Sequence, residues 1–281
     1  MRFGCHVSIA GKIYLAVDRA EARGCETMQI FSGNPRGWQD TQLLSRNIQE
    51  FNRRLKEAKI YPLVIHLPYL VNLGATEKNI RSKSAKAMFN AIERAKKLKA
   101  SYLVFHPGSH KGKGKEEGLI RVVSSLIHLL PLVGEEIKVL LENTSGAGFN
   151  LGANLAEFKF VFEELGWDSR LGICFDTAHA LAAGYDLSTK TGLDKTLKEL
   201  DDVLGIERLY LIHANDSRTP CGSHLDRHED IGKGYIGLKG FKRIVNHPLL
   251  RNLPCILETP HMSLEDDVRN LNAIKALYKE L

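Results

Sequence analysis

The sequence predicts an α/β protein that folds as a single TIM barrel, a (β/α)8 domain that spans residues 1–281. Short apolar runs alternate with amphipathic helical patterns, eight of each occur, and no linker or low-complexity segment interrupts them. Such alternation is typical of a parallel sheet, and eight units in about 250 residues suit a closed barrel. A doubly wound open sheet is the alternative, but it usually carries a glycine-rich phosphate turn after its first strand. The segment "GCHVSIAGK" at 4–12 is not that turn.

The first half of the chain contains four of these units. Its apolar runs are short and rich in β-branched and aromatic residues, as in "TMQIF" and "YLVFH", which favours strands. Each run is followed by a longer stretch in which apolar residues recur three or four positions apart, which predicts an amphipathic helix. We therefore expect strands at 2–7, 27–31, 61–66 and 102–106, and helices at 11–23, 40–59, 77–99 and 116–130.

The second half continues the same alternation with one exception. We expect strands at 138–143, 171–177, 207–213 and 254–259, and helices at 153–165, 193–204, 237–246 and 264–280. The exception is 213–232, which reads "HANDSRTPCGSHLDRHEDIG" and has no apolar periodicity. We expect neither an ordinary helix nor an ordinary strand there. The segment is either a solvated turn or one part of a metal site whose other ligands come from elsewhere in the chain.

Composition limits the class of protein but does not identify it. The chain is 43% hydrophobic and 26% charged, which is ordinary for a globular protein. No apolar run approaches a membrane span, and the N-terminal segment lacks the apolar region of a secretory signal, so we expect no membrane association. Five cysteines without a C-x-x-C pair indicate reduced thiols in a cytoplasmic protein and argue against a thiolate zinc site. A net charge of +6 permits a polyanionic partner without specifying one.

Six consecutive predicted strands, the third to the eighth, each end in a histidine or a carboxylate. These residues are His66, His106, Glu142, Asp176, His213 and Glu258. Polar residues often end strands because the chain is leaving the core, so one such residue would mean little. Six in succession are hard to explain in that way, and in a barrel the strand ends converge on the C-terminal mouth, where active sites are built. Histidines and carboxylates are the usual ligands of Zn²⁺ or Mn²⁺, so we expect a metal site at that mouth.

Three further ligand candidates lie just beyond the strands. They are His179 in "FDTAH", and Asp226 and His228 in "LDRH". The resulting nine candidates are too many for a single zinc ion, which takes about four ligands, and indicate two or three ions. Three divalent ions would outweigh the four carboxylates and leave a positive site, which would suit a phosphodiester substrate.

Several motifs resemble those of the endonuclease IV family of zinc-dependent apurinic/apyrimidinic (AP) endonucleases, along nearly the whole chain. The most specific is "IHANDSRTPCGSHLDRH" at 212–228; "GICFDTAH", "HLPYLVNLG", "GCHVSIAGK", "FHPGSH" and "ILET" agree as well. The chain departs from the family at Ala178, where Cys is frequent, at Pro68, where Ser is usual, and at Gly37, where some members carry Gln. None of the three departures removes a candidate ligand.

The resemblance implies three zinc ions, with Mn²⁺ possible at one position. By analogy with the family, His66, His106 and Glu142 would hold the first ion, and Glu142 would bridge to a second held by Asp176, His213 and Glu258. The third would be held by His179, Asp226 and His228. The implied reaction is cleavage 5′ to an abasic site in duplex DNA by a metal-hydroxide mechanism with Glu142 as the catalytic carboxylate. It leaves a 3′-hydroxyl and a 5′-deoxyribose phosphate, and removal of blocked 3′ ends is an expected second activity.

The resemblance also implies residues that contact DNA. Arg36 in "FSGNPRGW" and Tyr69 in "HLPYLVNLG" match positions that enter the base stack at the lesion, and both follow predicted strands. Without the match, each would be interpreted as an ordinary exposed loop residue. The basic run "KGKGK" at 111–115 lacks P-loop spacing and is predicted to be a solvated loop, with backbone phosphate contact as the alternative. The protein is expected to act as a monomer.

Other polar residues near the predicted mouth are not expected to bind a metal directly. His6 and His110 are candidates for residues that orient the ligands. Asn215 and Asp216 are expected to support the loop, and Glu229 and Asp230 are expected to be solvated. His224 matches no ligand position and stays without an assigned role.

Two other functions are compatible with the same residues. A metal-dependent sugar isomerase or epimerase of the xylose-isomerase-like barrels would also use carboxylates and histidines, but it would need fewer ions and no residues such as Arg36 and Tyr69. A non-enzymatic damage-binding protein with this fold is the second alternative, although the complete set of candidate ligands argues against it.

Overall fold

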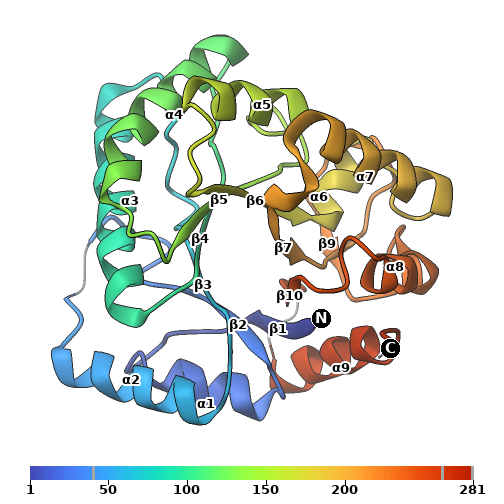
Figure 1. The fold of residues 1–281 in the computed structure, drawn as a ribbon, viewed down its shortest axis with the longest axis horizontal. Coiled ribbons are helices and arrows are strands. Elements are labelled where there is room, and N and C mark those ends of the chain that lie inside the picture. The colour runs from blue at the N-terminus through green and yellow to red at the C-terminus, as the bar shows by residue number, and fades with distance from the viewer. Residues whose placement is uncertain (40–41, 261–262, 280–281) are drawn as a thin grey trace.

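The computed structural model describes residues 1–39, 42–260 and 263–279, and the parallel strands in it close into a barrel of eight (Figure 1). These strands are β1 (Arg2–His6), β2 (Thr27–Phe31), β3 (Leu63–His66), β4 (Tyr102–Phe105), β5 (Lys138–Glu142), β6 (Leu171–Asp176), β7 (Leu209–His213) and β10 (Pro254–Leu257). Each strand pairs with its neighbours in chain order, and β1 closes the barrel by pairing with both β2 and β10. The predicted TIM barrel is confirmed.

Helices surround the strands in the order that the sequence predicts (Figure 1). They are α1 (Leu15–Ala22), α2 (Ser45–Glu57), α3 (Lys78–Leu98), α4 (Lys115–Leu129), α5 (Leu155–Glu164), α7 (Lys190–Leu204), α8 (Gly237–Asn246) and α9 (Leu264–Lys275). Short 3₁₀ turns lie at Leu130–Leu132 and Ile206–Arg208. The predicted start of one helix at 40 and the predicted end of another at 280 lie outside the described residues. Among the described residues, no helix combines the length and the apolar character needed to cross a membrane.

Three short elements do not follow the sequence prediction. Helix α6 (Thr177–Ala183) begins immediately after β6, and the Asp176 carboxylate caps it by accepting a 2.8 Å hydrogen bond from the His179 backbone N–H. Strands β8 (Asp216–Ser217) and β9 (His228–Glu229) pair antiparallel inside the segment where no ordinary strand was expected. Each has two residues and is too short to produce an apolar period, so the sequence pattern could not reveal it.

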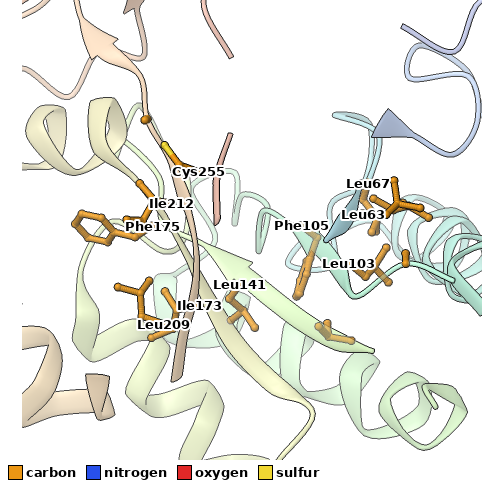
Figure 2. Packing of buried hydrophobic residues seen from close by; sticks show 14 of the residues in the cluster. Leu63, Leu67, Leu103, Phe105, Leu141, Ile173, Phe175, Leu209, Ile212 and Cys255 are labelled. Atoms are coloured by element: carbon orange, nitrogen blue, oxygen red, sulfur yellow. The ribbon is translucent and has the colours of Figure 1, made fainter. Parts of the chain in front are cut away.

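The strands carry apolar side chains on both faces. The outward face packs beneath the helices, and Figure 2 labels part of that layer: Leu63, Leu67, Leu103, Phe105, Leu141, Ile173, Phe175, Leu209, Ile212 and Cys255. The inward face fills the barrel with a second cluster, to which six strands contribute one residue each: Val64, Val104, Leu140, Cys174, Leu211 and Ile256. The interior is therefore a packed core, so polar side chains can gather only at its ends.

Candidate metal centre

A layer of polar side chains lies at the mouth, directly above the apolar interior cluster. Side chains alternate between the two faces of a strand, so the residue two positions after an inward-facing one faces inward as well. Two positions after the six interior residues stand the six strand-end candidates, His66, His106, Glu142, Asp176, His213 and Glu258. The barrel therefore brings all six side chains into one layer at its C-terminal end.

Glu142 lies within this layer and is completely buried. Its Oε2 atom is 2.9 Å from His66 Nε2 and 3.4 Å from His106 Nε2. Its Oε1 atom is 2.7 Å from His213 Nδ1. Because the two carboxylate oxygens face different histidines, the Glu142 side chain has the geometry to hold two cations, one through each oxygen.

His179 and His228 form a neighbouring group with two aspartates. His179 Nε2 is 3.3 Å from Asp226 Oδ2, and His228 Nε2 is 3.5 Å from Asp226 Oδ1 and 3.8 Å from Asp176 Oδ2. Helix α6 supplies His179, and the β8–β9 segment supplies Asp226 and His228. The Asp226 side chain is 53% exposed whereas that of Glu142 is fully buried, so this group opens toward solvent.

Side-chain ligand atoms approach within 4.8 Å of one another in three sets that cover most of the candidates: His66, His106 and Glu142; Glu142, Asp176, His213 and Glu258; and Asp176, His179 and His228. The first two sets coincide with those that the resemblance implies. The third contains Asp176 where the resemblance implies Asp226, although Asp226 contacts both of its histidines. Which side chain binds which ion stays a prediction.

Cys174 forms a further set with Glu142 and His213. Burial raises the pKa of its thiol, which disfavours the thiolate that would bind a metal. Histidine nitrogens and carboxylate oxygens are therefore better metal ligands here than the Cys174 thiol, in agreement with the expectation that the site is not built on thiolates.

Three of the histidines are oriented by backbone carbonyl oxygens. The Nδ1–O distances are 2.6 Å from His66 to Leu67, 3.0 Å from His179 to Asn143 and 2.8 Å from His228 to Glu258. Because a carbonyl oxygen only accepts, each Nδ1 carries a proton, and in a neutral ring each Nε2 presents a lone pair.

Those Nε2 atoms face carboxylate oxygens, and the buried Nε2 of His228 has no hydrogen-bond partner. A lone pair and a carboxylate repel each other unless a proton or a cation lies between them. Histidine metal ligands usually have this arrangement, with the second ring nitrogen donating to an acceptor. The donor set therefore fits zinc.

Without a bound cation, protons compensate these charges. Burial alone would raise the pKa of Glu142, but His106 and other histidines hold it well below its ordinary value. Burial would lower the pKa of His179, but Asp176 and Asp226 raise it to about 10. The pKa of Asp226 is lowered to about 2 by His179, against the effect of burial. Glu142 and Asp226 are therefore ionised near neutral pH, and a metal competes with protons for His179.

Two residues after β7 support the centre, as expected. The Asn215 side chain donates a 2.6 Å hydrogen bond to Asp176 Oδ2 and accepts one of 2.7 Å from the Glu258 backbone N–H. The Asp216 carboxylate accepts hydrogen bonds from the backbone N–H groups of Ser217, Gly232, Gly234, Ile236 and Gly237. Asp216 thus closes the long loop on itself, and this loop carries Asp226 and His228.

The prediction that Asp230 is solvated is wrong. Asp230 is only 3% exposed and accepts hydrogen bonds from Lys233, Arg269 and Asn270. The last two residues belong to α9, whose approach to this loop the local sequence does not reveal. Glu229 is partly exposed and pairs with Arg218 at 2.9 Å.

His224, which had no assigned role, connects two mouth loops. Its backbone is left-handed, with φ of 54°, and its Nδ1 lies 3.1 Å from the Ser145 carbonyl oxygen beyond β5. It thus lies apart from the three ligand sets and serves to hold the β8–β9 segment against the neighbouring loop.

Sequence reasoning missed Gln29, a completely buried residue of β2. Its Oε1 is 2.8 Å from His213 Nε2, and its Nε2 is 2.5 Å from Glu258 Oε1 and 3.0 Å from His6 Nδ1. A polar residue inside the apolar run "TMQIF" was the available signal, but Gln29 is neither a histidine nor a carboxylate and does not end its strand. His6 Nδ1 also lies 3.5 Å from Glu258 Oε1.

The two predicted DNA-contact residues lie beside the centre in mouth loops. Tyr69 is 70% exposed and Arg36 is exposed. Tyr69 lines a cavity of about 450 Å³ together with His106, His179 and Asp226. Both residues line an adjacent cavity of about 620 Å³ that also reaches Glu258. Their positions are compatible with contact to a molecule bound at the centre, and their role stays a prediction.

The departures from the family pattern and the basic loop lie around the same mouth. Pro68 lines the 450 Å³ cavity, and Ala178 is buried in α6. Residues 111–115 form an exposed loop before and at the start of α4, in agreement with the solvated interpretation. His110 packs edge-on against Phe149, with ring centroids 5.3 Å apart, and makes no contact with a ligand candidate that we find among the described residues.

Comparison with known proteins identifies relatives over the full length of the chain. Residues 17–280 match the family model described as a xylose isomerase-like TIM barrel. The chain is similar to a "Probable endonuclease 4" of Halothermothrix orenii, with 41% identity over 98% of this chain and 99% of the relative. A protein of the same description from Methanoculleus marisnigri is 42% identical over 98% of each chain.

Solved structures agree with the sequence relatives. Endonuclease IV from Thermus thermophilus superposes with a TM-score of 0.87 and 35% identity, and it covers 99% of this chain and 98% of its own. A D-tagatose 3-epimerase-like protein superposes with a TM-score of 0.73 at 21% identity, over 99% of this chain and 97% of its own. At that identity the second likeness shows the fold alone.

Proposed function

The chain belongs to the endonuclease IV family, and on that premise we propose that it hydrolyses the phosphodiester bond 5′ to abasic sites in duplex DNA. The products are a 3′-hydroxyl and a 5′-deoxyribose phosphate. The observation that carries this proposal is the single layer of histidines and carboxylates around the buried Glu142, in which ring lone pairs face carboxylate oxygens. That arrangement suits several cations, which phosphodiester hydrolysis uses and a one-ion epimerase does not need.

The nine candidates would hold three zinc ions in the sets that the resemblance implies, and Mn²⁺ would be accommodated at one position. Bound ions would supply a nucleophile at neutral pH, by lowering the pKa of water from 15.7 to about 7, and would neutralise phosphate oxygens. Asp176 belongs to two of the three sets of neighbouring ligand atoms, so its carboxylate lies where the buried and the exposed parts of the centre meet.

The protein's own side chains determine where the substrate can be placed. Glu142 is held between His66 and His213, which orients its two oxygens toward different ligand sets. The exposed side of the centre, at Asp226 and His228, opens into the 450 Å³ cavity, where the phosphate of a distorted strand would enter. Tyr69 and Arg36 would occupy the gap that an abasic nucleotide leaves when it turns out of the helix.

The deciding experiment combines metal analysis with a nicking assay. Purified protein should contain up to three zinc ions per chain and should cut a duplex oligonucleotide once, 5′ to a single tetrahydrofuran abasic analogue. The same preparation should release a 3′-phosphate from a nicked duplex, the proposed second activity. Turnover of a ketose without any nicking would establish the epimerase alternative, and tight binding of abasic DNA without cleavage would establish the damage-binding one.

A further inference from the structure

Gln29 connects two of the predicted metal ligands, His213 and Glu258. It lies on β2, and its side chain is completely buried. Its amide contacts three groups: His213 through Oε1, and Glu258 and His6 through Nε2. All hydrogen-bonding atoms of this side chain are therefore directed at residues of the candidate centre.

The contacts determine which way the amide of Gln29 points. Its nitrogen lies 2.5 Å from Glu258 Oε1, and an ionised carboxylate can only accept a hydrogen bond. The opposite orientation would place the amide oxygen against that carboxylate and leave both groups without a donor. The amide oxygen must therefore face His213 Nε2, 2.8 Å away.

This orientation determines the proton position on His213. Since the amide oxygen only accepts, His213 Nε2 carries a hydrogen and donates it to Gln29. The other ring nitrogen, Nδ1, then presents its lone pair to a cation, and it lies 2.7 Å from Glu142 Oε1 and 3.5 Å from Glu258 Oε2. His213 would thus ligate through Nδ1, whereas His66, His179 and His228 would present Nε2.

We propose that Gln29 is a positioning residue that holds His213 in its Nδ1-ligating tautomer and ties it to Glu258. The proposal rests on the proposed function in one respect, namely that His213 and Glu258 bind zinc. A neutral amide suits this place because it offers an acceptor to His213 and donors to Glu258 and His6 at once. A carboxylate at position 29 would add a third negative charge beside Glu142 and Glu258, and an apolar side chain would leave the buried His213 Nε2–H without an acceptor.

The first test reads the tautomer in the parent protein. Zinc-loaded protein labelled with ¹⁵N-histidine should show a slowly exchanging proton on His213 Nε2 in long-range ¹H–¹⁵N spectra. The His213 signal is identified by its absence from a His213→Gln variant. A proton on Nδ1 instead of Nε2 would overturn the proposal, whatever any variant at position 29 does.

The second test removes the amide but keeps the side-chain volume. Gln29→Met should retain the parent circular dichroism spectrum, lose the protected His213 proton, and bind zinc at one position about 10- to 100-fold more weakly in competition with a chelator. Gln49→Met, on the exposed face of α2, is the matched control and should leave both readouts unchanged. Parent zinc affinity together with an unchanged His213 signal in Gln29→Met would refute the positioning role.

These readouts use zinc alone and no DNA. A protein that passes them but never nicks abasic DNA contradicts the proposed function and leaves the role of Gln29 standing. A protein that nicks abasic DNA but gives the refuting result contradicts the role of Gln29 only.

Discussion

Replacing Glu142 by glutamine tests the centre most directly, because this substitution preserves volume and removes one charge. Glu142 is completely buried and lies 2.9 Å from His66 Nε2 and 2.7 Å from His213 Nδ1. Glutamine keeps one acceptor oxygen but turns an amide N–H₂ toward one of the two histidines. It can therefore no longer hold a cation on each side.

The magnitude follows from the burial of the charge. Removing one partner from a buried, hydrogen-bonded charge pair costs about 3–5 kcal/mol. If the same free energy is added to the activation barrier for nicking, the rate should fall by about 10²- to 10⁴-fold, since about 1.4 kcal/mol corresponds to a factor of ten.

The assay is single-turnover nicking of a duplex with one tetrahydrofuran residue, performed together with zinc analysis and circular dichroism. Glu163→Gln on α5 is the control, because Glu163 is exposed and pairs only loosely with Lys159, at 3.7 Å. A Glu142→Gln protein that keeps three zinc ions and nicks at the parental rate would refute the reasoning. A variant that keeps the parental circular dichroism spectrum but has lost zinc and activity would support it.

Four further predictions concern the mouth and its metals. Tyr69→Ala should weaken binding of abasic duplex by about 5- to 100-fold, because an aromatic contact with DNA is lost, and should leave the zinc content unchanged. Equal affinity of the variant and the parent in a fluorescence-anisotropy titration would show that Tyr69 is an ordinary loop residue. Zinc binding to chelator-treated protein at pH 8 should release protons, since the pKa of about 10 keeps His179 charged there and zinc binds the neutral ring. Calorimetric heats that do not vary with the ionisation enthalpy of the buffer would contradict this. In the chelator-treated chain, the raised pKa means that the His179 contribution to stability is complete below about pH 6.5 and is lost as the pH rises through about 10. Gly234→Ala would place a Cβ atom against the Ser217 carbonyl oxygen and 2.5 Å from Asp216 Oδ1. The loop should then become sensitive to proteolysis, and the exposed side of the metal centre should lose zinc. An unchanged cleavage pattern and zinc content would argue against Asp216 as the anchor of the loop.

The strand-end ligands could be predicted from two regularities of the chain, the repeated βα unit and the alternation of side chains along a strand. Each βα unit returns the chain to the same end of the barrel, and the period of two along a strand turns every second side chain inward. His66, Glu142 and His213 each follow an interior apolar residue by two positions, so chain spacing alone places them in one layer.

Other parts of the centre depend on contacts between distant segments and could not be predicted. Helix α6 is seven residues long and almost wholly buried, so it shows no amphipathic pattern. Asp230 is buried because α9 approaches it, through side chains that lie 39 and 40 residues further along the chain. Gln29 lies 184 residues from His213, and only closure of the barrel makes them neighbours.

The sequence by itself therefore determined the barrel, the end at which polar side chains gather, and the six strand-end candidate ligands, because these follow from local periodicity and from the residue type at each strand end. Only the tertiary structure decided which carboxylate oxygen faces which ring nitrogen, and which ring nitrogen carries the proton in four of the five candidate histidines. The physical reason is that these properties depend on the acceptor on the far side of each ring, a backbone carbonyl for His66, His179 and His228 and the amide of Gln29 for His213. Apart from Leu67, which directly follows His66, these acceptors lie 30 to 184 residues from the rings that they orient, and only the folded barrel brings them together.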